Sequence, residues 1–193
     1  MSPVLLIGSA VAAAAMLALW PRTAGAASLL PKLPKLGKPP PLPAYAPKDF
    51  QSTCDPTPKP GMMAFRDWVV ANFGGKAGGI SRACNQGGKS EHKEGRGWDW
   101  YPGSKENGDR MVKALLASDR YGRPHALARM WGIQYLVWYR RMWRAYDDHQ
   151  GPGPGWRAYS RTGNATQEHR DHVHFTMSRA RAADGAPEIS SAR

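Results

Sequence analysis

The spacing of apolar and polar residues predicts helices and strands from about residue 60 onward. Residues 61–73 carry large apolar side chains at helical spacing, and a glycine pair follows them as a stop signal. Short runs rich in aromatic and β-branched residues, bounded by glycine or polar clusters, are typical of strands. On these criteria we expect further helices over 109–117 and from Pro124 to Met130, and strands near 79–83, 97–101, 133–143 and 172–177. Residues 140–144 either continue the strand that begins at 133 or form its hairpin partner.

The strand predicted over 172–177 has a polar face. Side chains two apart on a strand share a face, so His172 and His174 point one way while the apolar residues that alternate with them point the other. In another predicted strand, Asp99 lies between two tryptophans in the same alternation. We therefore expect an α+β domain, with an antiparallel sheet of about four strands, helices on one face and a metal site on the other.

The two ends of the chain are expected to lie outside this domain. Residues 4–20 are apolar and small residues at 24–26 supply a signal-peptidase site, so residues 1–26 are expected to be a signal peptide. Because no lysine or arginine precedes the apolar run, an uncleaved membrane anchor is the alternative. In both cases we expect a secreted, cell-wall or cell-surface protein. A Pro/Lys-rich linker over 27–50, a folded domain over 51–180 and a disordered tail over 181–193 complete the predicted organisation.

Positive charge narrows the class of partner without identifying it. The formal net charge of +12 predicts attraction to polyanions such as wall polymers, anionic lipid or nucleic acid, although arginines also decorate soluble surfaces. A His-Asn-His nuclease would need an asparagine and a histidine after Asp171-His172, and residues 175–193 contain neither. We therefore expect a monomer that meets peptidoglycan or anionic wall polymers, and no nucleic acid.

Cys54 and Cys84 are the only cysteines of the chain. An even number of cysteines in an exported chain favours a disulfide. Thiolate ligation of a metal is the alternative, but the two residues are not closely spaced like those of a zinc ribbon. We expect the disulfide.

Two short runs carry the candidate metal ligands. One reads S-E-H-K-E-G-R-G-W-D and offers His92 and Asp99, and the other reads D-H-V-H and offers His172 and His174. Nitrogen and oxygen donors of this kind suit Zn²⁺, and three protein ligands would leave a fourth position for water. The sequence therefore predicts a zinc ion bound by these runs.

These runs resemble the signatures of a known group of zinc peptidases. The spacing of Ser90, His92, the two glycines and Asp99 resembles that of the zinc D-alanyl-D-alanine carboxypeptidases. The His-x-His resembles the second signature of the wider group that contains lysostaphin-type endopeptidases and the hedgehog signalling domain. The segments W-Y-R-R-M-W and W-R-A-Y-S are also similar to a secreted actinobacterial cell-wall hydrolase domain. The whole resemblance covers residues 60–178.

The resemblance implies a role for each residue of the two runs. His172 would be the catalytic base or would stabilise the transition state. Carboxypeptidase members use a glutamate three residues before the last histidine ligand, and because this chain has Asp171 there, Asp171 is the alternative base. Arg82 would hold the substrate carboxylate or the oxyanion, as an arginine on an equivalent strand does in those enzymes. The implied zinc ligands are His92, Asp99 and His174.

Other residues near the two runs could contact the substrate. Trp156 and Tyr159 follow the segment G-P-G-P-G and could line a groove, and His169 and Ser90 flank the predicted ligands. We expect a zinc peptidase that cleaves peptide bonds of bacterial peptidoglycan with metal-activated water, as a D,D-carboxypeptidase or an endopeptidase. The alternative is a non-catalytic, metal-containing module that binds the cell wall.

Overall fold

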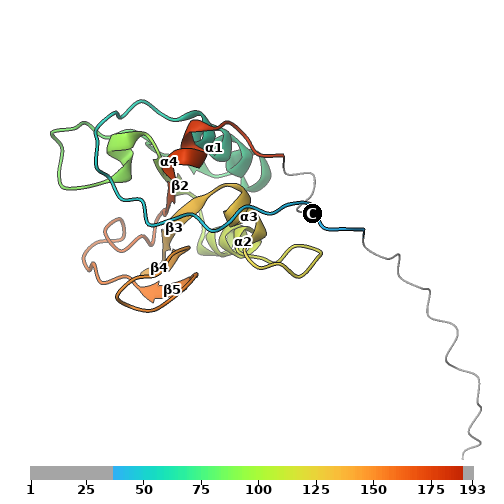
Figure 1. The fold of residues 1–193 in the computed structure, drawn as a ribbon. Coiled ribbons are helices and arrows are strands. Elements are labelled where there is room, and N and C mark those ends of the chain that lie inside the picture. The colour runs from blue at the N-terminus through green and yellow to red at the C-terminus, as the bar shows by residue number, and fades with distance from the viewer. Residues whose placement is uncertain (1–36, 189–193) are drawn as a thin grey trace, which may run out of the picture. The chain divides into compact units, whose positions relative to one another are not determined.

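The strands form one antiparallel sheet, seen in a computed structural model that describes residues 37–188 (Figure 1). Within that range the sheet has six strands in the order β1-β2-β6-β3-β4-β5, and each neighbouring pair is antiparallel. The predicted α+β class with an antiparallel sheet is confirmed, with more strands than we expected. The strands are β1 (Lys76–Ala77), β2 (Gly97–Tyr101), β3 (Ile133–Trp138), β4 (Arg141–Arg144), β5 (Gly155–Ala158) and β6 (Val173–Met177).

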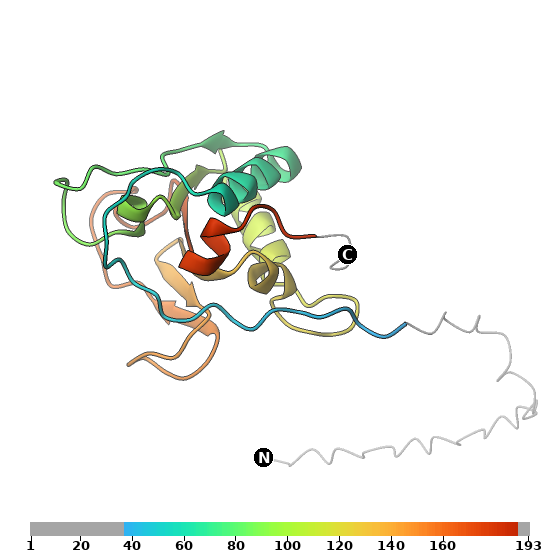
Figure 2. The same cartoon turned by 45° about the horizontal axis from the view of Figure 1, so that its top comes forward.

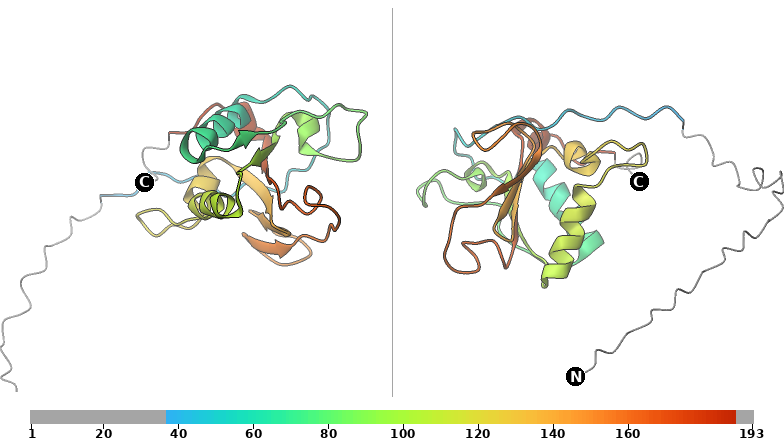
Figure 3. Two further views of the ribbon diagram at one scale, coloured as in Figure 1. Left: turned by 180° about the vertical axis from the view of Figure 1, so that it is seen from behind. Right: turned by 90° about the horizontal axis from the view of Figure 1, so that it is seen from below.

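Helices cover one face of the sheet and leave the other face to loops, as the right-hand view of Figure 3 shows. The first helix begins at Pro60, which suits a first helical turn because an N–H there would have no partner. It ends before Gly74, whose φ of 66° favours glycine. The helices are α1 (Pro60–Phe73), α2 (Lys105–Leu115), α3 (Ala126–Met130) and α4 (Arg179–Ala183), with a 3₁₀ helix, η2 (Glu91–Glu94), on the loop side.

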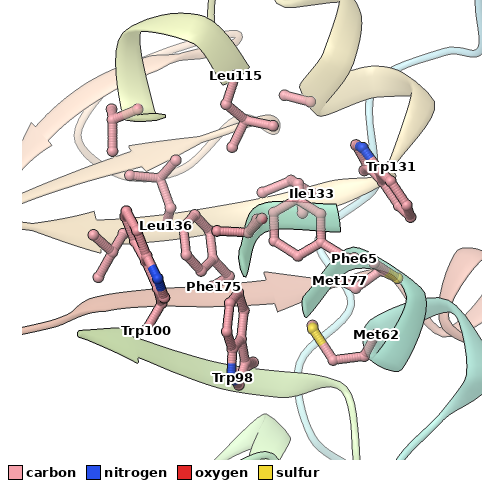
Figure 4. Packing of buried hydrophobic residues seen from close by; sticks show 14 of the residues in the cluster. Met62, Phe65, Trp98, Trp100, Leu115, Trp131, Ile133, Leu136, Phe175 and Met177 are labelled. Atoms are coloured by element: carbon pink, nitrogen blue, oxygen red, sulfur yellow. The ribbon is translucent and has the colours of Figure 1, made fainter. Parts of the chain in front are cut away.

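Large side chains fill the space between the helices and the sheet (Figure 4). The ring of Phe65 in α1 packs edge-on against Trp98 of β2 and Phe175 of β6, with centroid distances of 6.0 and 5.1 Å. All three side chains are fully buried, and each such burial stabilises the fold by roughly 1.5–3 kcal/mol. Because Asp99 and His174 alternate with these aromatic residues, the register that builds the core sends both polar side chains to the opposite face.

The segment 133–143 forms two strands, not one. The chain reverses at Tyr139 and Arg140, which have φ values of 50° and 64°, as a two-residue hairpin turn requires. The residues after the turn are therefore the hairpin partner of β3, one of the two arrangements that the sequence allowed. The next segment adds β5, which was not predicted, at the edge of the sheet.

The strand predicted over 79–83 does not form. The edge strand beside β2 is β1, which ends at Ala77. The chain then crosses to η2. Its backbone is hydrogen-bonded to that helix and not to a strand, since the N–H of Arg82 donates to the carbonyl of His92 at 3.1 Å. This segment is consequently a loop that supports the polar face.

The described parts of the predicted linker and tail pack on the domain more closely than the sequence indicated. In the predicted linker, the carbonyls of Pro40 and Pro43 accept hydrogen bonds from arginine side chains at 2.6 and 2.8 Å, and Ala46 is buried. Helix α4, whose Ala182 is buried in the core, packs beside α1 (Figure 2) and occupies the start of the tail that was expected to be disordered. The predicted signal peptide over 1–26 lies outside the described residues. No helix within residues 37–188 is both long and apolar enough to cross a membrane.

The predicted disulfide between Cys54 and Cys84 is present, with its Cα atoms 5.9 Å apart. The alternative of thiolate ligands is therefore wrong. The Nζ of Lys93 donates to the carbonyls of Cys84 and Gly87 at 2.9 and 3.0 Å. The covalent bond and this lysine together hold the loop that leads into η2.

Candidate metal centre

His92, Asp99 and His174 converge on the loop face of the sheet. Asp99 in β2 and His174 in β6 are direct cross-strand partners, and η2 brings His92 over them. The Nδ1 of His174 lies 2.8 Å from Oδ1 of Asp99 and 3.3 Å from Nε2 of His92. The third side of the triangle, from Nε2 of His92 to Oδ1 of Asp99, is 3.4 Å. These three residues could hold a metal ion.

Glycine brings η2 this close to the sheet. A Cβ at Gly97 would lie 2.9 Å from the backbone nitrogen of His92, so a larger residue would push the histidine away. Gly95 ends η2 in the left-handed conformation, with φ of 63°. Both glycines of the first sequence run are thus required by the geometry of the site.

The outer nitrogen of each candidate imidazole ligand is already bonded. Nδ1 of His92 lies 2.9 Å from the carbonyl of Ile80, and because a carbonyl only accepts, this nitrogen carries the proton. Nε2 of His174 lies 3.1 Å from Oγ1 of Thr176. When Nε2 donates to Thr176, both inner nitrogens present lone pairs to the same point.

The charge states of the cluster also suit a cation. Burial favours the neutral form of Asp99, but the imidazoles of His174 and His92, when their inner nitrogens are protonated and donate to the carboxylate, outweigh burial and hold the pKa of Asp99 far below its usual range. Burial lowers the pKa of His174, which keeps the imidazole neutral. An ionised carboxylate and neutral imidazoles are the forms that bind metals.

His172 and Asp171, which the sequence left as rivals, lie side by side. Nδ1 of His172 is 2.7 Å from Oδ1 of Asp171, and the hydroxyl of Thr166 donates to the other carboxylate oxygen at 2.6 Å. Nε2 of His172 faces the cluster, 3.7 Å from Oδ1 of Asp99. The two residues are therefore not interchangeable: His172 faces the cluster, and Asp171 is bonded to the opposite side of the imidazole ring.

The cluster lies in a cavity of about 410 Å³. Most of the predicted site residues line it, with two exceptions. Asp171 points to His172 instead, and Trp156 lies on the other face of the sheet, because β5 pairs it with Trp143 of the core. The expectation that Trp156 shares a groove with the metal site is therefore wrong. The predicted residues that line the cavity are Arg82, Ser90, His92, Asp99, Tyr159, His169, His172 and His174.

His169 is held in an unusual conformation at the cavity wall. Its φ is 52°, and its ring centroid lies 4.6 Å from that of His172 and 4.9 Å from that of Tyr159. Its Nδ1 is buried without a hydrogen-bond partner. Burial, together with the imidazoles of His174 and His172, lowers the pKa of His169 to about 3. The ring is therefore neutral.

Several residues of the cavity were missed by sequence analysis. Tyr135 donates its hydroxyl to Glu91 at 2.6 Å, and its ring centroid is 5.7 Å from that of His174. Alternation along β3 could have placed Tyr135 on the polar face, and alternation along β6 could have placed Thr176 there. The loop residues carry no such signal. The missed lining residues are Lys89, Glu91, Tyr135, Val137, Met142, Arg161, Thr166 and Gln167.

One family model, described as VldE, C-terminal domain, matches residues 54–170, which is more than half of the chain. The matched range includes His92 and Asp99 and ends before His172. No curated protein and no solved structure matches the chain. The chain therefore belongs to the family of the VldE C-terminal domain.

Proposed function

We propose that this protein is a secreted zinc peptidase that cleaves peptide bonds of bacterial peptidoglycan. The observation that carries the proposal is the arrangement of His92, Asp99 and His174. Three donor atoms meet at the wall of an open polar cavity, and the outer nitrogen of each imidazole is occupied by a partner.

The spacing of the donors is compatible with zinc. Tetrahedral coordination with bonds of about 2.0–2.1 Å places ligand atoms about 3.3 Å apart. The three separations here are 2.8, 3.3 and 3.4 Å. When bound, Zn²⁺ would polarise the scissile carbonyl and lower the pKa of a water molecule to about 7.

His172 supplies the proton transfer in this proposal. With Nδ1–H donated to Asp171, Nε2 keeps a lone pair that faces the cavity. This nitrogen takes a proton from the attacking water and returns it to the leaving amine, so that the proton count balances. Asp171 fixes the orientation of the ring and stabilises its protonated form, as the third member of a catalytic triad does.

Cationic side chains in the cavity support an anionic substrate. Arg82, Lys89 and Arg161 line the same cavity as the candidate ligands. They can pair with a substrate carboxylate or with the developing oxyanion, and a positively charged wall also attracts acidic polymers. The predicted signal peptide and the disulfide agree with action outside the cytoplasm.

The test combines metal analysis with digestion of purified sacculi. The purified chain should carry about one zinc ion and release soluble peptide fragments, and a chelator should stop the release. H92A should lose both properties. The matched control is H149A, because His149 is an exposed histidine outside the cavity, and it should keep both.

Two results would count against this function. Fragment release by an H92A protein that has lost zinc would refute the assignment of the site. Zinc-dependent binding to sacculi without release of fragments would instead favour the non-catalytic wall-binding module.

A further inference from the structure

A second cavity, of about 530 Å³, lies on the helix side of the sheet. It is formed where α2, the β3–β4 turn and β5 meet, and it shares no lining residue with the cavity of the metal site. We refer to it as the aromatic groove, defined by Lys105, Lys113, Leu116, Tyr139, Arg141 and Trp156.

The groove exists because helix cover ends before the edge of the sheet. Trp143 of β4 and Trp156 of β5 are cross-strand partners on the same face. Trp143 is 1% exposed, whereas Trp156 is only partly buried. In Figure 1, β5 lies at the far edge of the sheet from α1. An aromatic ring is thus left open to solvent on a face that is otherwise core.

Positive charges and aromatic rings alternate along the groove. The guanidinium of Arg141 lies 4.7 Å from the ring centroid of Trp156, and Nζ of Lys105 lies 4.9 Å from that of Tyr139. Tyr139 is itself an exposed residue, at 39%. Lys113 adds a third cation, and the one carboxylate in the lining is already bonded to Lys105 and to an indole N–H. The surface therefore has ring faces and unneutralised positive charge in close succession.

The turn that carries Tyr139 is fixed by hydrogen bonds to the segment before β6. Tyr139 and Arg140 both have positive φ without being glycine, a conformation that persists only where neighbours enforce it. Their N–H groups donate to the carbonyls of His169 and Glu168, at 2.8 and 3.1 Å. Since His169 lines the cavity of the metal site, the turn that lines the groove is hydrogen-bonded to a residue of the other cavity.

We propose that the aromatic groove binds an acidic saccharide, a sugar chain that carries carboxylate groups. The apolar face of a sugar ring would pack on Tyr139 or Trp156, and a carboxylate would pair with Lys113 or Arg141. The choice of a saccharide among acidic ligands rests on the proposed function at the cell wall. An acidic peptide fits less well, because an extended backbone would add to the free edge of β5 and would not fill the space between ring faces.

Calorimetric titration of the full chain with two disaccharides tests the proposal. One is N-acetylglucosaminyl-N-acetylmuramic acid, which has a carboxylate, and the other is neutral N,N′-diacetylchitobiose. The acidic disaccharide should bind at least about tenfold more tightly, because the neutral one leaves the cations unpaired. K113E should weaken binding by about tenfold, and K76E, an equal charge change at exposed Lys76 on β1, should leave it unchanged.

The titration also separates the groove from the metal site. Binding should persist in H92A and in chelator-treated protein, since neither change reaches the groove. Equal binding of the two disaccharides, no effect of K113E, or competition by polyglutamate would each overturn the proposal, as would loss of binding in H92A. Failure of peptidase activity alone, with binding of the acidic disaccharide intact, would remove the proposed reaction and support the groove.

Discussion

Replacement of Thr176 by valine should weaken metal binding without removing a ligand. Thr176 is fully buried, and its hydroxyl lies 3.1 Å from Nε2 of His174. Valine has nearly the same volume, so the substitution leaves no cavity but takes away the hydrogen-bond partner of the outer imidazole nitrogen. The inner nitrogen of His174, Nδ1, lies 2.8 Å from Asp99. Without the bond from Nε2 to Thr176, nothing holds the ring proton on Nε2 and leaves the lone pair on Nδ1.

The size of the effect follows from the cost of the unpaired group. A buried N–H that loses its acceptor costs about 1–3 kcal/mol. The imidazole can avoid this cost by moving its proton to Nδ1, but that nitrogen faces the proposed metal position, and its proton would then have to be displaced when the metal binds. One tenfold change corresponds to about 1.4 kcal/mol, so we expect zinc affinity to fall roughly 10–100-fold.

The assay is competition for zinc against a chromophoric chelator. T162V is the matched control, because Thr162 is exposed and does not line the cavity. Thermal unfolding of both metal-free variants shows whether the fold is intact. An unchanged zinc affinity in a folded T176V protein would refute the reasoning that Thr176 sets the tautomer of His174.

Two further substitutions test the site and its support. D171N should reduce turnover by roughly 10²–10⁴-fold at unchanged zinc content, because His172 loses the carboxylate behind it; a steady-state kcat equal to that of wild type would contradict this role. G95A and G87A both place alanine at positive φ, 63° and 62°, but only at Gly95 would the added Cβ strike a backbone carbonyl, that of Thr57. In urea unfolding G95A should therefore lose about 1–3 kcal/mol more than G87A, and equal losses would rule out the clash.

The sequence predicted correctly those parts of the fold in which apolar and polar residues alternate without interruption. Alternation in β2 and β6 assigned the two faces of the central strands correctly, because each apolar residue there is core. The sequence did not decide whether the chain turns at Tyr139 and Arg140, since these residues lack the glycine or asparagine that normally marks a hairpin turn. Strand β5 is short and follows a Gly/Pro-rich segment, so it has the composition of a loop.

The candidate ligands could be predicted from the sequence, but parts of their surroundings could not. His92, Asp99 and His174 stand in short runs whose residue types and spacing suit a metal. The partner of His92 is the carbonyl of Ile80, and a backbone group leaves no mark in the sequence. The position of Trp156 depends on the register between β4 and β5, which only the paired strands reveal.

The bond between Cys54 and Cys84 bears on how the protein should be handled. It anchors the loop that supplies Arg82, Lys89 and Ser90 to the wall of the cavity. Dithiothreitol in a purification buffer would open this anchor by thiol exchange and would also chelate zinc. For the proposed zinc site, metal content measured after such a preparation would be too low for two independent reasons, so samples should be kept free of thiols until the metal content has been measured.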